Sequence, residues 1–164
     1  MSSNACSPEV FKSLCLSSIN VQAVTATPVV GYPVVPLSIP IPNHGDFGPT
    51  TADFCNVTVT YTQVGEDENP IIFEAWLPSH GDWNKRIMGT GGSEFAMGRY
   101  PGGYAHMAGV VSEGFAAFTS DGGAPDPTGL LFALKEPGVL DEVLLRTWST
   151  EAINDMVCSK TIHA

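Results

Sequence analysis

Hydrophobic and polar residues alternate along residues 54–62, "FCNVTVTYT", as they do in a strand with one buried face. The apolar positions are Cys55, Val57, Val59 and Tyr61, and the polar positions between them are Asn56, Thr58 and Thr60. Residues 65–70, "GEDENP", predict a polar turn, and residues 71–77, "IIFEAWL", predict the returning strand. The two apolar segments therefore predict a β-hairpin.

The pattern after the hairpin predicts strands and helices in alternation. Residues 86–89 predict a third strand, residues 103–114 a short helix that ends at Gly114, and residues 115–123 a fourth strand. Residues 140–159 predict one long helix, with Asp141 and Glu142 in its first turn, where the helix dipole favours acidic side chains. Its apolar face comprises Leu140, Val143, Leu144, Trp148, Ala152 and Met156. The first fifty residues are rich in Pro and Ser and predict extended segments and turns.

A strand followed by a helix and a second strand predicts a parallel pair with a crossover, so the expected class is α/β. The third strand runs directly into the glycine-rich stretch "RIMGTGGSEFAMGRYPGG", residues 86–103. So many glycines have two explanations: they form a flexible loop, or they allow the backbone to approach a ligand closely. In open α/β sheets ligands bind at the carboxyl ends of strands, which is where this stretch lies.

Length and charge restrict the classes of function. The 164 residues are enough for one domain with a core, and 43% of them are hydrophobic. The formal net charge of −10 argues against nucleic acid or an anionic membrane surface as a partner. The opening "MSSNACSPEV" lacks the basic start and apolar segment of a signal peptide, and no apolar stretch is long enough to predict a membrane span.

Cysteine usage nevertheless indicates an extracellular protein. The four cysteines are even in number and scattered, without the spacing of a metal site. Asn56 begins an "NVT" triplet, which makes it a candidate for N-glycosylation, and lysine is scarce. The two "HGD" triplets, at residues 44–46 and 80–82, are expected to form turns, and we predict no metal site.

Four segments in this order resemble the fungal tannase and feruloyl esterase family. They are "FCNVTVTYT", "IIFEAWLPSHGDWNKRIMGTGG", "GFAAFTSDGG" and "LLRTWSTEAINDMV". The stretch "FEAWLPSHGDWNKRIMGTGG" is the most specific of them, and the resemblance covers the chain from Cys6 to about Val157. It corresponds to the N-terminal portion of family members.

The resemblance implies an α/β-hydrolase fold and a secreted serine esterase acting on aromatic-acid esters such as ferulate or gallate. It implies that Gly91 and Gly92 contribute to the oxyanion hole, and that Cys6 and Cys55 form the family's first disulfide. Residues 1–50 would be an extended segment tied to the core, and residues 51–164 the N-terminal part of the hydrolase domain. Cys15 and Cys158 have no assigned partner.

The expected hydrolase fold is incomplete. No serine has glycine at both −2 and +2, and nothing resembles the family's "G-C-S-x-G-G" nucleophile turn. The strand with this turn, the catalytic acid and base, and the lid with the family's calcium site would all lie later than the predicted helix. Ser93, His106 and Asp121 lie in three different segments, and we do not expect them to form a triad. No catalytic residue is therefore predicted in these residues.

Two hypotheses follow. In the first, the chain is the N-terminal part of a secreted serine esterase, inactive by itself, whose substrate would be a small aromatic ester. In the second, it is a small acidic binding module that kept the strands and lost the chemistry. An open frame for the nucleophile turn in the downstream genomic sequence would favour the first. The sequence does not identify the ester, because in the family the lid selects it.

Overall fold

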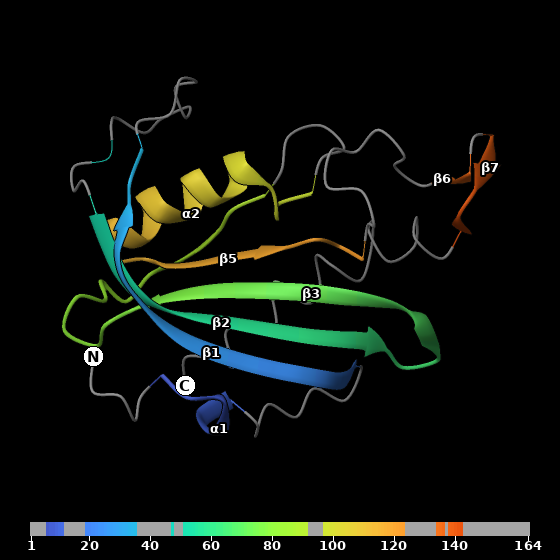
Figure 1. Ribbon diagram of the computed structural model, residues 1–164, viewed down its shortest axis with the longest axis horizontal. Helices are drawn as coiled ribbons and strands as arrows, with labels where there is room; N and C mark the ends of the chain where they lie inside the picture. Colours follow the sequence, from blue (N-terminus) through green and yellow to red (C-terminus); the bar gives the residue numbers. More distant parts are fainter. Residues whose placement is uncertain are drawn as a thin grey trace.

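The computed structural model describes residues 6–11, 19–35, 47, 51–91, 97–123, 134–136 and 138–142. The elements in chain order are α1 (Pro8–Phe11), β1 (Ile19–Pro33), β2 (Thr51–Gln63), β3 (Glu66–Pro78), β4 (Ile87–Gly89), α2 (Pro101–Ser112), β5 (Ala116–Ser120), β6 (Leu134–Glu136) and β7 (Val139–Leu140). Five strands form one sheet in the order β1-β2-β3-β5-β4, and β6 pairs separately with β7 (Figure 1).

The predicted hairpin is confirmed as the antiparallel pair of β2 and β3. The apolar positions of β2 are buried, whereas Asn56, Thr58 and Thr60 are half-buried on the other side. The turn is shorter than the sequence predicted, because the strands continue until Gln63 pairs with Glu66. Gly65 occupies this turn with φ of 89°, in the left-handed region that glycine adopts without strain.

The predicted crossover is also confirmed: β4 and β5 are parallel, and α2 connects them. Pro101 opens α2, where its missing N–H costs no helical hydrogen bond. The chain leaves the helix through Gly114, whose φ is 83°. The mixed sheet with a parallel β4–α2–β5 unit places the chain in the α/β class.

The two faces of the sheet carry two separate cores. Figure 1 shows α2 on one side of the sheet and α1 on the other. The core beneath α2 consists of Ala52, Phe54, Trp76, Met107, Ala108, Val110, Val111 and Ala117. The core on the opposite face includes Cys6 and Phe11, from the segment around α1, with the inward side chains of β2, β3 and β5. The sheet is therefore covered on both faces, as α/β sheets are.

A disulfide joins Cys6 to Cys55, with 5.6 Å between the two Cα atoms. This is the pair that the family resemblance implied. The bridge holds the α1 segment against the middle of β2 across a sequence separation of 49 residues. Both cysteines are buried in the core opposite α2. Cys15 and Cys158 lie outside the described residues.

Strand β1 was not predicted as a member of the sheet. It pairs antiparallel with β2 and forms one edge, with irregular register on either side of Ala23 to Val29. Its side chains are exposed or half-buried throughout, so its sequence lacks the alternation of β2. An edge strand also tolerates Pro28 and Pro33, since one side needs no ladder hydrogen bonds.

The predicted start of the long helix is wrong. Leu140 belongs to β7, which pairs with β6 through a turn at Gly138, where φ is 81°. Val139 and Leu140 belong to the β6–β7 pair, Asp141 follows it, and Glu142 is in helical conformation, so the predicted helix begins two residues later than expected. The rest of the predicted helix lies outside the described residues. Within the described part of the chain, no helix is long and apolar enough to cross a membrane.

Candidate functional site

The glycine-rich loop lies at the carboxyl ends of the parallel strands β4 and β5. Thr90, the first residue after β4, donates from its backbone N and from its Oγ1 to the carbonyl oxygen of Phe118, at 2.7 and 3.1 Å. At the other end, the Gly98 N–H donates to the carbonyl oxygen of Ser120 at 3.1 Å. Both ends of the loop are therefore attached to β5, at the edge where ligands bind in open α/β sheets.

Packing explains several of the glycines that the sequence concentrates here. A Cβ on Gly103 would lie 1.9 Å from the backbone oxygen of Gly98, and one on Gly98 would lie 1.9 Å from Oγ1 of Thr119. A Cβ on Gly102 would lie 2.7 Å from the Tyr100 ring. Gly98 and Gly103 are therefore required by packing, because backbone atoms leave no room for a Cβ, whereas the Tyr100 ring beside Gly102 could move.

Gly91 is different from these packing glycines. A Cβ at Gly91 would meet no atom of the described residues within 4 Å, and the φ of Gly91 lies outside the left-handed region. Neither packing nor backbone conformation therefore requires glycine at this position. Gly92 lies outside the described residues, so its surroundings are not described.

Alanine substitutions distinguish the two kinds of glycine. We expect Gly103→Ala to lower the free energy of unfolding by about 2 to 3 kcal/mol, because the clash is with backbone that cannot rotate away. Gly91→Ala should change it by less than about 0.5 kcal/mol. Urea denaturation of both variants measures the difference, and equal effects would contradict this distinction.

A buried carboxylate, Glu74 on β3, connects the loop to the sheet. Its Oε2 accepts hydrogen bonds from Nε of Arg99 at 3.0 Å and from the Tyr104 hydroxyl at 2.9 Å. Its Oε1 accepts one from the Trp76 indole at 2.9 Å. The Glu74 side chain is 5% exposed and that of Arg99 is 24% exposed. Arg99 directly follows Gly98, so the ion pair holds the returning end of the loop.

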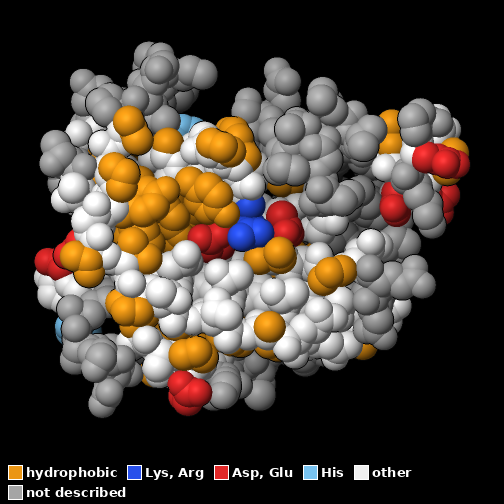
Figure 2. Space-filling model, viewed as in Figure 1, with side chains coloured by type: hydrophobic (Ala, Val, Ile, Leu, Met, Phe, Trp, Pro, Cys, Tyr) orange, Lys and Arg blue, Asp and Glu red, His pale blue; other side chains and the backbone are white. Residues whose placement is uncertain are grey.

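Aromatic rings surround this ion pair. Trp76 stacks on Phe54 at 4.2 Å and on Tyr104 at 5.8 Å between ring centroids. Tyr32 meets Trp76 edge-on at 4.8 Å. Burial, followed by the nearby Glu74 charge, raises the pKa of Tyr104 to about 12. Tyr104 is therefore a hydrogen-bond donor at neutral pH. Figure 2 shows this face with an apolar patch bordered by a cationic group and acidic groups.

Asp121, just after β5, is the second acidic partner of Arg99. Its Oδ1 accepts the backbone N–H groups of Ile72 and Gly123, both at 2.9 Å, and its Oδ2 lies 3.7 Å from Nη1 of Arg99. Burial raises the pKa of the Asp121 carboxyl above its usual value, although these three partners act in the opposite direction. The Asp121 side chain thus joins the turn after β5 to β3.

The raised pKa predicts a pH dependence of stability. Folded Asp121 retains its proton at pH values where the unfolded chain, with a pKa of about 3.9, has lost it. This carboxyl therefore lowers the free energy of unfolding as the pH rises through the interval between the two pKa values. The Asp121→Asn variant keeps the Oδ1 acceptor and does not titrate. Denaturation is measured from about pH 4 to pH 7. The free energy of unfolding of wild type should fall relative to that of Asp121→Asn as the pH rises. A difference that does not change with pH would contradict a raised pKa of Asp121.

The expectation that Ser93, His106 and Asp121 form no triad stays a prediction, because only two of the three residues are described. His106 lies half-buried on α2, Asp121 is occupied as described, and Ser93 lies outside the described residues. Asn56, the glycosylation candidate, lies in the middle of β2 and is half-buried, and its side-chain oxygen has no hydrogen-bond partner among the described residues. Its modification stays a prediction.

The second "HGD" triplet forms a turn after β3. The backbone N–H groups of Asp82 and Trp83 both donate to the Ser79 carbonyl, and the Asp82 carboxylate accepts from the Ser79 hydroxyl. The first triplet lies outside the described residues. Within the described ranges, no three His, Cys, Asp or Glu side chains are grouped so that they could hold a metal ion.

The residues "WNKR", 83–86, lie in the same connection between β3 and β4. Asn84 donates from its side-chain nitrogen to the carbonyl oxygen of Glu113 at 3.0 Å, and its backbone N–H donates to Gly114 at 2.9 Å. Its side-chain oxygen accepts the Arg86 N–H at 2.9 Å. This part of the most specific stretch therefore joins the start of β4 to the end of α2.

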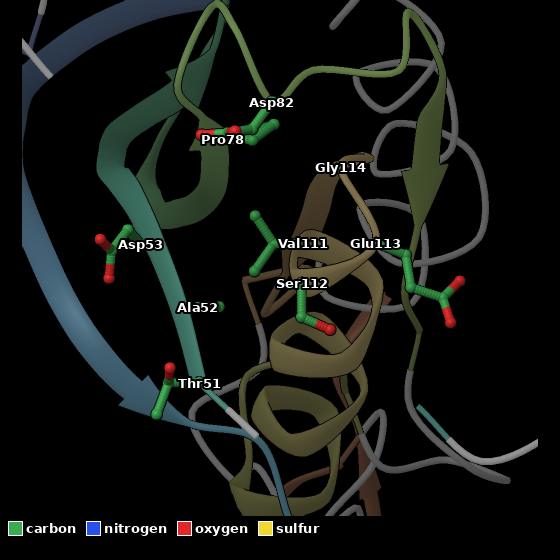
Figure 3. Close-up of a pocket in the computed structure, with 9 residues that line it drawn as sticks. All are labelled: Thr51, Ala52, Asp53, Pro78, Asp82, Val111, Ser112, Glu113 and Gly114. Atoms are coloured by element: carbon green, nitrogen blue, oxygen red, sulfur yellow. The ribbon is translucent and has the colours of Figure 1, made fainter. Parts of the chain in front are cut away.

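A separate cavity of about 500 Å³ lies between the ends of β2 and β3 and the end of α2 (Figure 3). Three of its lining residues are acidic: Asp53, Asp82 and Glu113. Asp53 accepts a hydrogen bond from the Gly31 N–H at 2.7 Å, and the carboxylates of Asp53 and Glu113 point away from each other. The carboxylates therefore do not converge on one ligand position.

Curated proteins resemble the chain in sequence. It is 32% identical over 109 residues to a protein from Arthroderma benhamiae described as a probable feruloyl esterase, and 35% identical over 72 residues to a tannase from Aspergillus oryzae. These alignments cover 65% and 42% of the chain, but only 20% and 12% of the two relatives. No protein-family model matches the chain.

Solved structures resemble the chain over nearly its whole length. Tannin acyl hydrolase from Aspergillus niger matches with a TM-score of 0.70 and 25% identity, over 96% of the chain and 28% of that structure. Feruloyl esterase B from Aspergillus oryzae matches with a TM-score of 0.57 and 23% identity, over 94% of the chain and 28% of that structure. The resemblance to tannases and feruloyl esterases is confirmed, and the chain spans less than a third of each of these proteins.

Proposed function

We propose that residues 1–164 are part of a secreted carboxylic ester hydrolase that acts on esters of aromatic acids. The relatives in sequence and in fold carry the names tannase, tannin acyl hydrolase and feruloyl esterase. The Cys6–Cys55 disulfide supports an oxidising compartment such as the cell exterior. The substrate would be a small aromatic ester.

The observation that carries the proposal is the position of Gly91. It lies just after β4, at the carboxyl end of the parallel pair, and its lack of a side chain is not needed for packing. In this proposal Gly91 and Gly92 leave room for the oxygen of an ester carbonyl to approach backbone N–H groups. One such donor stabilises the oxyanion of the tetrahedral intermediate by about 3 kcal/mol.

In this proposal the serine nucleophile, the acid and the base are not among residues 1–164, and the chain alone has no esterase activity. No serine in the sequence has the glycine neighbours of a nucleophile turn. Strand β4 pairs with β5 on one side and, within the described sheet, with no strand on the other. In an α/β-hydrolase the strand that carries the nucleophile would occupy that free edge.

Expression of residues 1–164 under oxidising conditions tests whether the chain alone lacks esterase activity. We expect no hydrolysis of methyl ferulate or methyl gallate above the rate of a buffer blank. Because the edge of β4 exposes unpaired backbone groups, gel filtration should show association of the chain. Ester turnover that disappears in a Ser93→Ala variant would overturn the claim that the nucleophile lies outside these residues.

A further inference from the structure

Gly98 lies directly against the backbone that precedes Gly91. The position that a Cβ on Gly98 would occupy is 3.0 Å from the carbonyl oxygen of Thr90 and 3.3 Å from that of Ser120. Ser120 also accepts the Gly98 N–H, at 3.1 Å. Gly98 therefore contacts the chain just after β4 as well as the end of β5, and the contact with Thr90 is made through space rather than along the loop.

The Thr90 carbonyl belongs to the peptide group that carries the Gly91 N–H. The two hydrogen bonds that Thr90 donates to Phe118 fix the peptide group before Thr90 and the Thr90 side chain. The peptide group after Thr90 can still turn about ψ of Thr90. Since this group is planar and trans, its oxygen and its N–H point in opposite directions. The contact of the Thr90 oxygen with Gly98 therefore sets the direction of the Gly91 N–H.

The Gly91 N–H is directed away from β5. Gly98 is bonded to Ser120, so the Thr90 oxygen that meets Gly98 lies on the β5 side of the chain, as the Thr90 N–H does. In extended backbone the N–H groups of successive residues point to opposite sides. The Gly91 N–H therefore points to the edge of β4 that has no neighbouring strand within the described sheet.

Close approach, and not backbone conformation, accounts for glycine at position 98. The φ of Gly98 lies outside the left-handed region, so an alanine could adopt the same conformation. The three atoms nearest to the absent Cβ are all oxygens, from Thr119, Thr90 and Ser120. A side chain at this position would have to displace the Thr90 carbonyl or move Gly98 away from it.

We propose that Gly98 is a positioning residue: its contact with the Thr90 carbonyl holds the Thr90–Gly91 peptide group so that the Gly91 N–H points to the open edge of β4. This contact requires no substrate. Its consequence for catalysis, the alignment of the Gly91 N–H with an ester oxygen, rests on the oxyanion role proposed above.

NMR on residues 1–164 measures ψ of Thr90 through cross-correlated relaxation of the Thr90 Cα–H and Gly91 N–H bonds. In wild type we expect an extended ψ, between about 100° and 180°. In Gly98→Ala we expect ψ of Thr90 to change by at least about 10°, because a Cβ at 3.0 Å from a backbone oxygen forces the two apart.

A second variant keeps the test valid if Gly98→Ala does not fold. The Thr119 hydroxyl is buried and has no hydrogen-bond partner among the described residues, so Thr119→Ala leaves no group unpaired. In Gly98→Ala/Thr119→Ala the clash at 1.9 Å is absent, and the Thr90 oxygen becomes the nearest atom to the new Cβ. We expect ψ of Thr90 to change in this variant relative to Thr119→Ala alone.

Gly102→Ala is the matched control, because its Cβ would meet only the Tyr100 ring, and ψ of Thr90 should stay as in wild type. An unchanged ψ of Thr90 in the Gly98 variants would overturn the proposal, and so would a helical ψ in wild type. An equal change in Gly102→Ala would overturn it as well, since the effect would then not depend on the contact of Gly98. The measurement involves no ester, so a failed contact and a failed oxyanion role give separate results.

Discussion

Replacement of Glu74 with alanine should lower the free energy of unfolding by about 3 to 5 kcal/mol, the range measured when one partner of a buried ion pair is removed. The variant leaves three donors without their acceptor: the Trp76 indole, the Tyr104 hydroxyl and Nε of Arg99. Arg99 keeps Asp121 at 3.7 Å, which is too long for a strong hydrogen bond. Urea denaturation followed by tryptophan fluorescence measures the loss.

Tyr104→Phe is the matched control, because it removes one donor of the same carboxylate and keeps the stacked ring. Loss of a single hydrogen bond to a charged group should cost about 1.5 to 3 kcal/mol. If Glu74→Ala costs no more than Tyr104→Phe, then Glu74 does not organise the group of donors described here.

Loss of the Cys6–Cys55 disulfide should lower the free energy of unfolding by about as much as Glu74→Ala does. The Cys6–Cys55 bridge closes a loop with a sequence separation of 49 residues, and in the chain-entropy model such a bridge stabilises by about 4 kcal/mol. Both cysteines are buried, so alanine at either position also leaves the other thiol inside the core. Thermal denaturation of each variant under oxidising conditions measures the loss.

The Cys6→Ala and Cys55→Ala variants form a double-mutant cycle with the doubly substituted chain. Each single variant should lose about as much stability as the double variant, because each removes the same bridge. Additive losses in the double variant would contradict a Cys6–Cys55 bridge in the folded protein.

Local patterns were sufficient to predict the central part of the fold. β2, β3, α2 and β5 follow from alternation, from the helical segment before Gly114 and from the order of the elements. β1 could not be predicted in this way, because both sides of an edge strand are exposed and its residues need not alternate. The start of a helix at Leu140 was wrong, since the sequence does not show that Leu140 pairs with Leu134.

The candidate site was predicted only in part. The position of the glycine-rich loop followed from the strand before it, but Arg99 and Tyr104 were missed because they lie 25 and 30 residues from Glu74 in the sequence. One feature of the sequence did indicate a buried charged group. Glu74 lies in the apolar segment "IIFEAWL" and on the same side of β3 as Trp76, where alternation predicts burial, so a charged residue there requires partners.

We propose that residues 1–164 supply the fold and the oxyanion donors of an ester hydrolase, but not its nucleophile. The most direct measurement uses tannin acyl hydrolase from Aspergillus niger with its matching segment replaced by residues 1–164. We expect this hybrid to hydrolyse methyl gallate, and we expect Gly91→Val to lower its kcat by about 10²- to 10³-fold. The melting temperature of Gly91→Val should stay unchanged, because space around Gly91 is open. Small and parallel losses of kcat and melting temperature, or a folded hybrid without activity, would contradict the account.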